Sequence, residues 1–275
     1  MWKRLLGLLL FVALTLLTQV GGVIFAVCWF VSRFLPRIPA WRRAAINIAL
    51  FAGLYVVTSI FVVPPLAALG GRVPLPCSAT ADRPFAAANP MFCWLNRHYV
   101  DARLTTLMDD LSRDIARHYP GTVTLFLDAN LPFINGFPLL PHLSHGDGRK
   151  LDIAYYYRGA DGSYRPGQTR SPIGYWAFEQ PGAGDTPSPC SATAWLTTRW
   201  DMQFLQALFP DRPLEPERTR AALRWLTTEG QRSGIERVFI EHYLAARLGV
   251  SSPLLGFQGC RAARHDDHIH IQVRR

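Results

Sequence analysis

Residues 264–273 read RHDDHIHIQV, and this stretch places three of the chain's eight histidines within six residues. Successive side chains of a β-strand point to opposite faces, so His268 and His270 share one face of a predicted final strand. The alternate positions carry the apolar residues that a half-buried strand requires, namely Ile269, Ile271 and Val273. Two imidazoles on one strand face make half of a metal site, and the upstream sequence has to supply the other half.

The chain after residue 95 alternates between helical and extended patterns. Apolar periodicity and end signals predict helices over residues 96–118, 194–208 and 215–231. Strands are predicted over residues 122–127, 153–157 and 236–243. Because no βαβ unit repeats, these elements favour an α+β fold, a small antiparallel sheet flanked by helices over residues 95–275. Residues 70–94 are rich in Pro, Ala and small polar residues and are predicted to be a linker.

Two long apolar runs precede this domain, at residues 5–31 and 44–63. Each has the roughly 20 residues that a helix needs to cross the hydrocarbon core of a bilayer. Residues 1–69 are therefore predicted to form a two-helix transmembrane hairpin. A cleaved signal peptide is the alternative, but its apolar core is only about 7–15 residues long, and no small-residue cleavage site follows the first run closely.

The basic character of the chain is concentrated in this apolar region. Residues 1–69 hold six basic and no acidic residues, which leaves 23 basic and 20 acidic residues in residues 70–275. The remaining net charge of +3 is that of an ordinary protein surface. The total net charge of +9 therefore gives no support to nucleic-acid binding, and no nucleic-acid partner is expected.

Basic residues also indicate how the apolar runs are oriented. The loop between them, residues 32–43, carries four arginines, and the positive-inside rule places such a loop in the cytoplasm. Both ends of a two-helix hairpin would then lie outside the cytoplasm. Lys3 and Arg4 favour the opposite orientation.

Four of the five cysteines lie beyond the second apolar run: Cys77, Cys93, Cys190 and Cys260. An even number in this region favours two disulfides in an oxidising compartment, with three pairings open. Four free or buried thiols in a cytosolic domain are the alternative.

The second half of the metal site is predicted around residues 145–152. His145 and Asp152 are seven residues apart, and the segment between them contains two glycines that allow a turn to bring them together. His and Asp are normal zinc ligands, and His270 would be the third. Three protein ligands with one open position are typical of a catalytic zinc, whereas a structural zinc usually has four protein ligands.

These residues resemble a known family. The segment PHLSH at 141–145, the later Asp152, and the pattern HxxHxH at 265–270 are similar to the penicillin-insensitive murein endopeptidases. That family belongs to the wider group of lysostaphin, D-Ala-D-Ala peptidases and hedgehog domains. The group signature is HxxxxxxD with a later HxH, and two further histidines, His142 and His265, extend the match. The resemblance covers roughly residues 95–275 and does not include the apolar runs.

The resemblance implies a bound Zn²⁺ and a role for each residue around it. The implied ligands are His145, Asp152 and His270, with His142 either a neighbour or a further ligand. His268 is the implied general base, and His265 lies nearby as a supporting group. A base at this position accepts a proton from water and passes it to the leaving amine.

Asp267 is the alternative general base, because D-Ala-D-Ala peptidases carry a Glu three residues before the last His ligand. Strand alternation points Asp267 away from the face of His270, which favours His268. Asp266, Asp267 or a backbone carbonyl is expected to orient the imidazoles. The acidic residue and His that complete a second metal position in murein endopeptidases are not identifiable in residues 155–180, so a second metal stays open.

The sequence therefore predicts a zinc metallopeptidase, embedded in the inner membrane by several passes, with its catalytic domain in the periplasm. The resemblance to the murein endopeptidases implies that its substrates are the peptide stems or cross-links of peptidoglycan. A D,D- or L,D-carboxypeptidase of the same group is one alternative. A non-catalytic, zinc-stabilised domain that binds the cell wall or a protein partner is the other. The aromatic loop over residues 158–178 is a predicted wall of the substrate groove.

Overall fold

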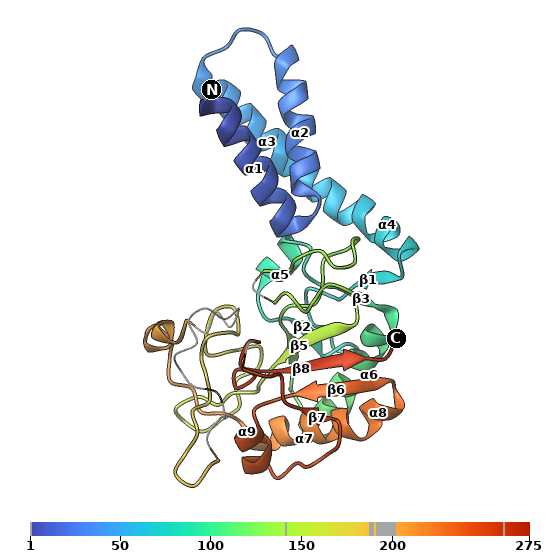
Figure 1. The fold of residues 1–275 in the computed structure, drawn as a ribbon, viewed down its shortest axis with the longest axis vertical. Helices are drawn as coiled ribbons and strands as arrows, with labels where there is room; N and C mark the ends of the chain where they lie inside the picture. The colour runs from blue at the N-terminus through green and yellow to red at the C-terminus, as the bar shows by residue number, and fades with distance from the viewer. Residues whose placement is uncertain (1, 141, 187–189, 191–201, 261) are drawn as a thin grey trace.

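The computed structural model describes residues 2–140, 142–186, 190, 202–260 and 262–275. Apolar helices form one end of the molecule, and a domain of strands and helices forms the other (Figure 1). The helix predicted over residues 194–208 lies largely outside the described residues. Its last part forms a short 3-10 helix, η3 (Gln203–Leu208).

The centre of the domain is a six-stranded sheet with the strand order β2-β4-β5-β8-β6-β7. The strands are β2 (Phe85–Ala87), β4 (Thr124–Phe126), β5 (Lys150–Ala154), β6 (Ile235–Phe239), β7 (Leu255–Gly256) and β8 (His268–Val273). The four central strands pair antiparallel, and the two edge pairs, β2–β4 and β6–β7, are parallel. The predicted antiparallel sheet is confirmed for the part that carries the histidines.

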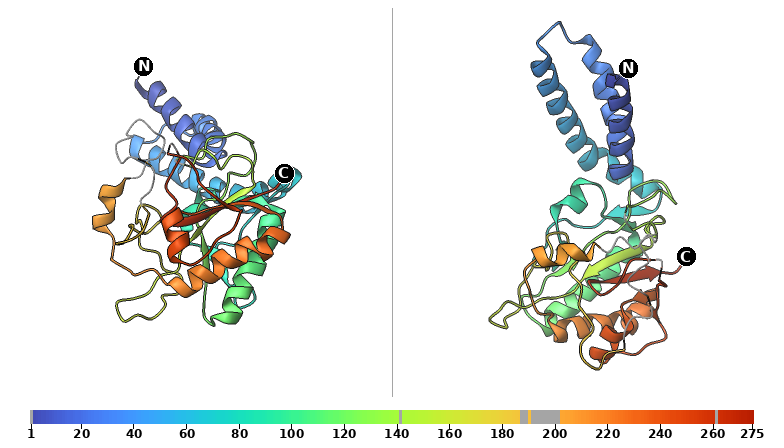
Figure 2. Two further views of the ribbon diagram at one scale, coloured as in Figure 1. Left: turned by 60° about the horizontal axis from the view of Figure 1, so that its bottom comes forward. Right: turned by 60° about the vertical axis from the view of Figure 1, so that its left-hand side comes forward.

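One face of this sheet packs against two neighbouring helices, α6 (Ala102–His118) and α7 (Pro216–Thr227) (Figure 2). The apolar residues of α6 recur at three- and four-residue steps and are buried: Leu104, Leu107, Met108, Leu111 and Ile115. They belong to one core with Ile269, Ile271 and Val273 of β8. The apolar face of the final strand therefore points toward the helices, and its histidines point to the opposite side of the sheet.

Strand pairing differs in detail from the sequence predictions. Strand β5 begins at Lys150 and not at residue 153, so Asp152 lies within it. The helix predicted from residue 96 begins at Ala102, because β3 (Tyr99–Asp101) first pairs with β1 (Arg72–Pro74). The strand predicted over residues 236–243 ends at Phe239, and the short helix α9 (His242–Arg247) follows. The helix predicted over residues 215–231 is divided into α7 and α8 (Glu229–Arg232).

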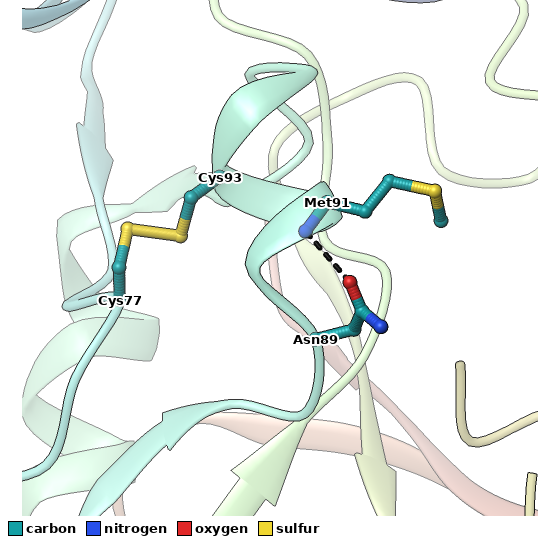
Figure 3. The surroundings of a disulfide bond; sticks show 4 residues. All are labelled: Cys77, Asn89, Met91 and Cys93. Carbon is teal, nitrogen blue, oxygen red and sulfur yellow. Dashed lines mark hydrogen bonds between the residues drawn. A yellow bond between two sulfur atoms is a disulfide. The ribbon is translucent and has the colours of Figure 1, made fainter. Parts of the chain in front are cut away.

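Residues 70–94 are part of the domain, so the prediction of a linker was wrong. They contain β1, β2 and the short helix α5 (Pro90–Trp94), which is capped by the Asn89 side chain accepting the Met91 N–H at 2.8 Å (Figure 3). Leu75 and Phe85 are buried in the main core. Composition resembles a linker here because each element is very short and depends on partners far along the chain.

Two disulfides are present, as predicted. Cys77 pairs with Cys93 across the segment just described (Figure 3), and Cys190 pairs with Cys260. Cys28, within the apolar helices, is a free thiol. The structure thus selects one of the three pairings that the sequence left open.

The first apolar run is not a single helix. It forms α1 (Trp2–Thr18) and α2 (Gly21–Val31), which reverse direction at Gln19, a residue with a positive φ of 61° (Figure 1). A Cβ atom on Gly22 would lie only 1.9 Å from Thr15 Oγ1, so glycine is required for the close approach of the two helices. The predicted span over residues 5–31 was therefore wrong, because glycines at the turn allow the chain to fold back.

The second apolar run is part of one continuous helical segment of 30 residues, Ala40–Leu69. It consists of α3 (Ala40–Val57), a π-helical turn η2 (Thr58–Val62) and α4 (Val63–Leu69). Among the described residues it is the one helix long and apolar enough to cross a membrane. The chain start and the segment between α2 and α3 lie at the end of the molecule away from the domain (Figure 1).

The apolar helices contact the domain through the turn between α1 and α2. Gln19 Oε1 accepts the backbone N–H of Phe133 at 2.8 Å. Val20 packs in a small apolar cluster with Phe133, Val63 and Tyr99. The apolar helices therefore contact the loop that follows β4. The same loop carries His145.

Candidate metal centre

Three donor atoms from distant parts of the chain converge beside β8. His145 Nε2 lies 3.1 Å from His270 Nδ1 and 3.3 Å from Asp152 Oδ1. His270 Nδ1 lies 2.8 Å from the same Asp152 oxygen. All three side chains are buried. The residues that the sequence predicted as metal ligands are thus brought together, because strand pairing sets Asp152 directly opposite His270.

The size of this triangle fits Zn²⁺. In a tetrahedral site with bonds of 2.0–2.1 Å, neighbouring donor atoms lie about 3.3 Å apart. The three observed edges are 2.8, 3.1 and 3.3 Å. Two imidazole nitrogens and a carboxylate oxygen are also a donor set that zinc favours. His145, Asp152 and His270 therefore form a candidate site for a divalent metal ion.

The protonation of His145 suits this role. Its Nδ1 lies 2.6 Å from the carbonyl oxygen of Ala129. A carbonyl only accepts, so Nδ1 carries the proton and Nε2 keeps its lone pair for the centre of the triangle. A backbone carbonyl thus orients this imidazole, as expected.

The charges of the other two corners are set by burial and by their neighbours. Burial raises the pKa of Asp152, but His145 and His268 outweigh this and hold that pKa well below its usual range. Burial lowers the pKa of His270 to about 4. At neutral pH, Asp152 is therefore ionised and His270 is neutral, which are the forms that bind a metal.

His268 lies beside the triangle, with its Nε2 3.6 Å from Asp152 Oδ1. Its Nδ1 lies 2.5 Å from Asp267 Oδ1, and the other oxygen of Asp267 accepts the Trp176 N–H at 2.7 Å. Burial lowers the pKa of His268, but Asp152 and Asp267 outweigh burial and raise it to about 9. In the absence of a metal ion the ring is therefore protonated at neutral pH, and Asp267 holds it with Nε2 toward the triangle.

The expectation that Asp267 points away from this face was wrong. Strand β8 begins at His268, so Asp267 precedes the strand and strand alternation does not govern it. Its carboxylate instead orients His268, which is the supporting role predicted for Asp266, Asp267 or a carbonyl.

His142 lies next to the triangle and not at one of its corners. Its Nδ1 is 2.9 Å from Asp128 Oδ2 and 3.7 Å from Asp152 Oδ2. Arg97 holds Asp128 through two bonds of 2.6 Å each. Tyr175 donates its hydroxyl to Asp152 at 2.7 Å and accepts the Asp128 N–H at 2.9 Å. This arrangement gives His142 a supporting position in a buried polar network.

Sequence reasoning did not identify three members of this network: Arg97, Asp128 and Tyr175. Asp128 and Arg97 are 31 residues apart and carry no spacing signature. Burial raises the pKa of Asp128, but Arg97 and His142 hold it well below its usual range. Tyr175 belongs to the aromatic loop predicted as a groove wall, but its side chain is buried against the metal centre.

His265 completes the cluster of imidazoles. Its ring centroid lies 4.8 Å from that of His268 and 5.4 Å from that of His270. Burial lowers its pKa well below the usual value, so the ring is neutral. Within the part of the chain that the structure describes, its buried Nδ1 has no hydrogen-bond partner. A neutral, buried nitrogen without a partner is suited to contact a group bound at this centre.

The loop that carries His145 is also held by a residue that follows the apolar helices. Arg72 is buried and donates to the carbonyl oxygens of Leu131 and Gly146 and to the side chain of Asn135. The same loop also contacts the α1–α2 turn, where Gln19 accepts the backbone N–H of Phe133. The loop is therefore held both by Arg72 and by the turn between the first two apolar helices.

A second cluster of donor atoms consists of Cys77, Cys93 and His98. The two sulfur atoms are bonded to each other, so only the imidazole remains as a donor. This cluster does not have the ligands of a metal site.

No protein-family model matches the chain, and a search of the curated proteins finds no match. The similarity to murein endopeptidases therefore rests on the histidine and aspartate pattern alone.

Proposed function

We propose that the chain is a membrane-anchored zinc metallopeptidase that hydrolyses peptide bonds in peptidoglycan stems or cross-links. The observation that carries this proposal is the buried triangle of His145, Asp152 and His270 with His268 beside it. Three protein ligands leave a fourth position for chemistry. The choice of peptidoglycan follows from the resemblance of the His and Asp pattern to the murein endopeptidases.

When bound, Zn²⁺ supplies a Lewis acid that polarises a peptide carbonyl and acidifies water. A cation held by the triangle would repel a proton on His268 and so favour its neutral form. Nε2 of the neutral ring would then accept the proton of the attacking water and return it to the leaving amine. Asp267 fixes the tautomer and orientation of His268 and balances the positive charge that develops on its ring. Tyr175 holds Asp152 in place through its second oxygen.

We also propose that α1, α2 and the helix Ala40–Leu69 lie in the inner membrane and that the domain faces the periplasm. Because the chain reverses at Gln19, its start and the loop after α2 share one end, and this end carries all six basic residues of residues 1–69. The positive-inside rule assigns that end to the cytoplasm. Lys3 and Arg4 then agree with the loop arginines, and the two disulfides agree with an oxidising periplasm.

The activity is tested on the full-length protein in detergent. The purified chain is loaded with zinc and incubated with peptidoglycan, and the released peptides are identified by mass spectrometry. Cleaved cross-links or stems are expected from the wild type. His268→Ala should abolish cleavage and keep the zinc, because His268 is not at a corner of the triangle. His242→Ala, on α9 and outside the cluster, serves as the matched control.

Each other outcome selects a different function. Release of terminal D-Ala alone would identify a carboxypeptidase, and zinc binding without any cleavage would identify a binding domain. Loss of zinc from His268→Ala would mean that His268 is a metal ligand and that the roles of ligand and general base were assigned the wrong way round. The topology is tested separately by fusing alkaline phosphatase to the C-terminus, where an inactive fusion would contradict the periplasmic placement.

A further inference from the structure

A groove of about 590 Å³ lies between α1 and α2, away from the metal centre. Its walls are formed by the apolar side chains of Leu8, Phe11, Phe25 and Trp29. Leu8 and Trp29 are both more than half exposed. The volume is within the range of about 300–1,000 Å³ that is usual for small-molecule sites. The lining of the groove is mainly apolar, which suits a hydrocarbon chain.

Small residues open the groove. Gly7 and Ala26 line it, and a Cβ atom added to Gly7 would meet no atom within 4 Å. The space next to Gly7 is therefore a real part of the groove and is not filled by a neighbouring side chain. A hydrocarbon chain can lie in this groove along the surface of the two helices.

One end of the groove is cationic. Arg4 and Arg33 line it there, and the Arg33 guanidinium lies 3.9 Å from the centre of the Trp29 ring, which forms part of the wall. The first acidic residue of the chain is Asp82, so no carboxylate from the apolar helices neutralises these arginines. Guanidinium groups bind phosphate oxygens through paired, charge-assisted hydrogen bonds.

We propose that this groove binds an anionic membrane phospholipid. The lipid phosphate pairs with Arg4 and Arg33, and an acyl chain lies along the wall past Gly7. The charged end of the groove is the end that carries all six basic residues of residues 1–69. Anionic headgroups on the cytoplasmic surface attract such clusters. This inference rests on the membrane placement of α1 and α2 proposed above, and it is independent of peptidase activity.

The test measures lipid retention by the full-length protein. The protein is purified in detergent, mixed with phosphatidylglycerol or with phosphatidylcholine of identical acyl chains, and examined by native mass spectrometry. Bound phosphatidylglycerol is expected, with phosphatidylcholine at least about tenfold weaker, because both lipids carry the phosphate but only phosphatidylcholine adds a trimethylammonium cation, which the two guanidinium groups repel. Equal retention of the two lipids would overturn the proposal, since it would indicate only a general apolar coat.

Two variants probe the two halves of the site. Arg33→Gln removes a guanidinium, and Gly7→Leu fills the channel with a side chain that favours the helix. Each should lower phosphatidylglycerol retention by about tenfold or more. The matched controls are Arg42→Gln, at the same end but outside the groove, and Gly53→Leu, at an open glycine of α3. Unchanged retention in both test variants, or an equal loss in the controls, would refute the site.

Discussion

Replacing Asp267 by Asn tests whether the orientation of His268 matters for proton transfer. Asp267 accepts the Trp176 N–H through Oδ2 at 2.7 Å and faces His268 Nδ1 through Oδ1 at 2.5 Å. In Asp267→Asn the amide oxygen has to stay on the Trp176 N–H, because that donor needs an acceptor. The amide NH2 group then faces His268 Nδ1. In its neutral form the His268 ring then carries its proton on Nε2, and the lone pair that would serve as the base is lost.

The size of the effect follows from the role of the lost lone pair. General acid–base catalysis contributes about 10²–10⁴-fold to the rate, which corresponds to about 3–5 kcal/mol of activation free energy. In the Ser-His-Asp triad, the same Asp-to-Asn change acts through the wrong tautomer and costs about 10⁴-fold in kcat. We therefore expect Asp267→Asn to lower kcat by about 10²–10⁴-fold. Zinc content should not change, because Asp267 is not a corner of the triangle.

The assay compares kcat for peptidoglycan cleavage and bound zinc in the wild type, Asp267→Asn and the control Asp161→Asn. Asp161 is an exposed loop carboxylate paired with Arg165, so its replacement should leave both quantities unchanged. The tautomer is read independently from the carbon chemical shifts of labelled His268. A zinc-loaded Asp267→Asn protein with near wild-type kcat would refute the reasoning, and so would an unchanged tautomer.

Four further outcomes follow from the structure. Removing zinc with a chelator should lower the melting temperature of the full-length protein, because the metal binds only the folded form; an unchanged melting temperature would argue against a resident metal. Arg97→Met should destabilise the domain by about 3–5 kcal/mol in denaturant titrations, because it leaves the buried Asp128 without its main partner. Arg72→Met should weaken zinc binding in competition titrations by about tenfold, since it frees the loop of His145, whereas the more exposed Arg83→Met should not. Burial lowers the pKa of His98 to about 4, below its unfolded value of about 6.5, so the unfolded state binds the extra proton and stability falls as pH falls between these values. The loss should be about 2 kcal/mol between pH 7 and pH 5, and His98→Gln should reduce this pH dependence in denaturant titrations at the two pH values.

Local pattern was sufficient for those parts of the fold whose residues lie close together in the chain. The two-residue period of β8 predicted that His268 and His270 share a face, and the buried Ile269 and Ile271 confirm it. The three- and four-residue steps of α6 predicted its buried face in the same way. Local pattern failed where short elements depend on distant partners, as in residues 70–94, and where glycines allowed α1 and α2 to pack as a hairpin.

The candidate metal centre could likewise be predicted from the sequence only in part. Residue type and order identified His145, Asp152 and His270, because the ligand chemistry of His and Asp is a property of each side chain. Arg97 and Tyr175 could not be found, because nothing near them in the chain indicates that they meet Asp128 or Asp152.

The sequence by itself determined the candidate metal ligands His145, Asp152 and His270, the shared strand face of His268 and His270, and that residues 1–69 are apolar with all their charge basic. Only the tertiary structure decided that Asp152 lies opposite His270, that Asp267 orients His268, and that the first apolar run folds back at Gln19. The physical reason is the distance along the chain over which each effect acts. Side-chain chemistry and backbone period act within a few residues, whereas strand register and buried ion pairs join residues separated by tens to more than a hundred positions, and these are chosen by packing of the whole chain.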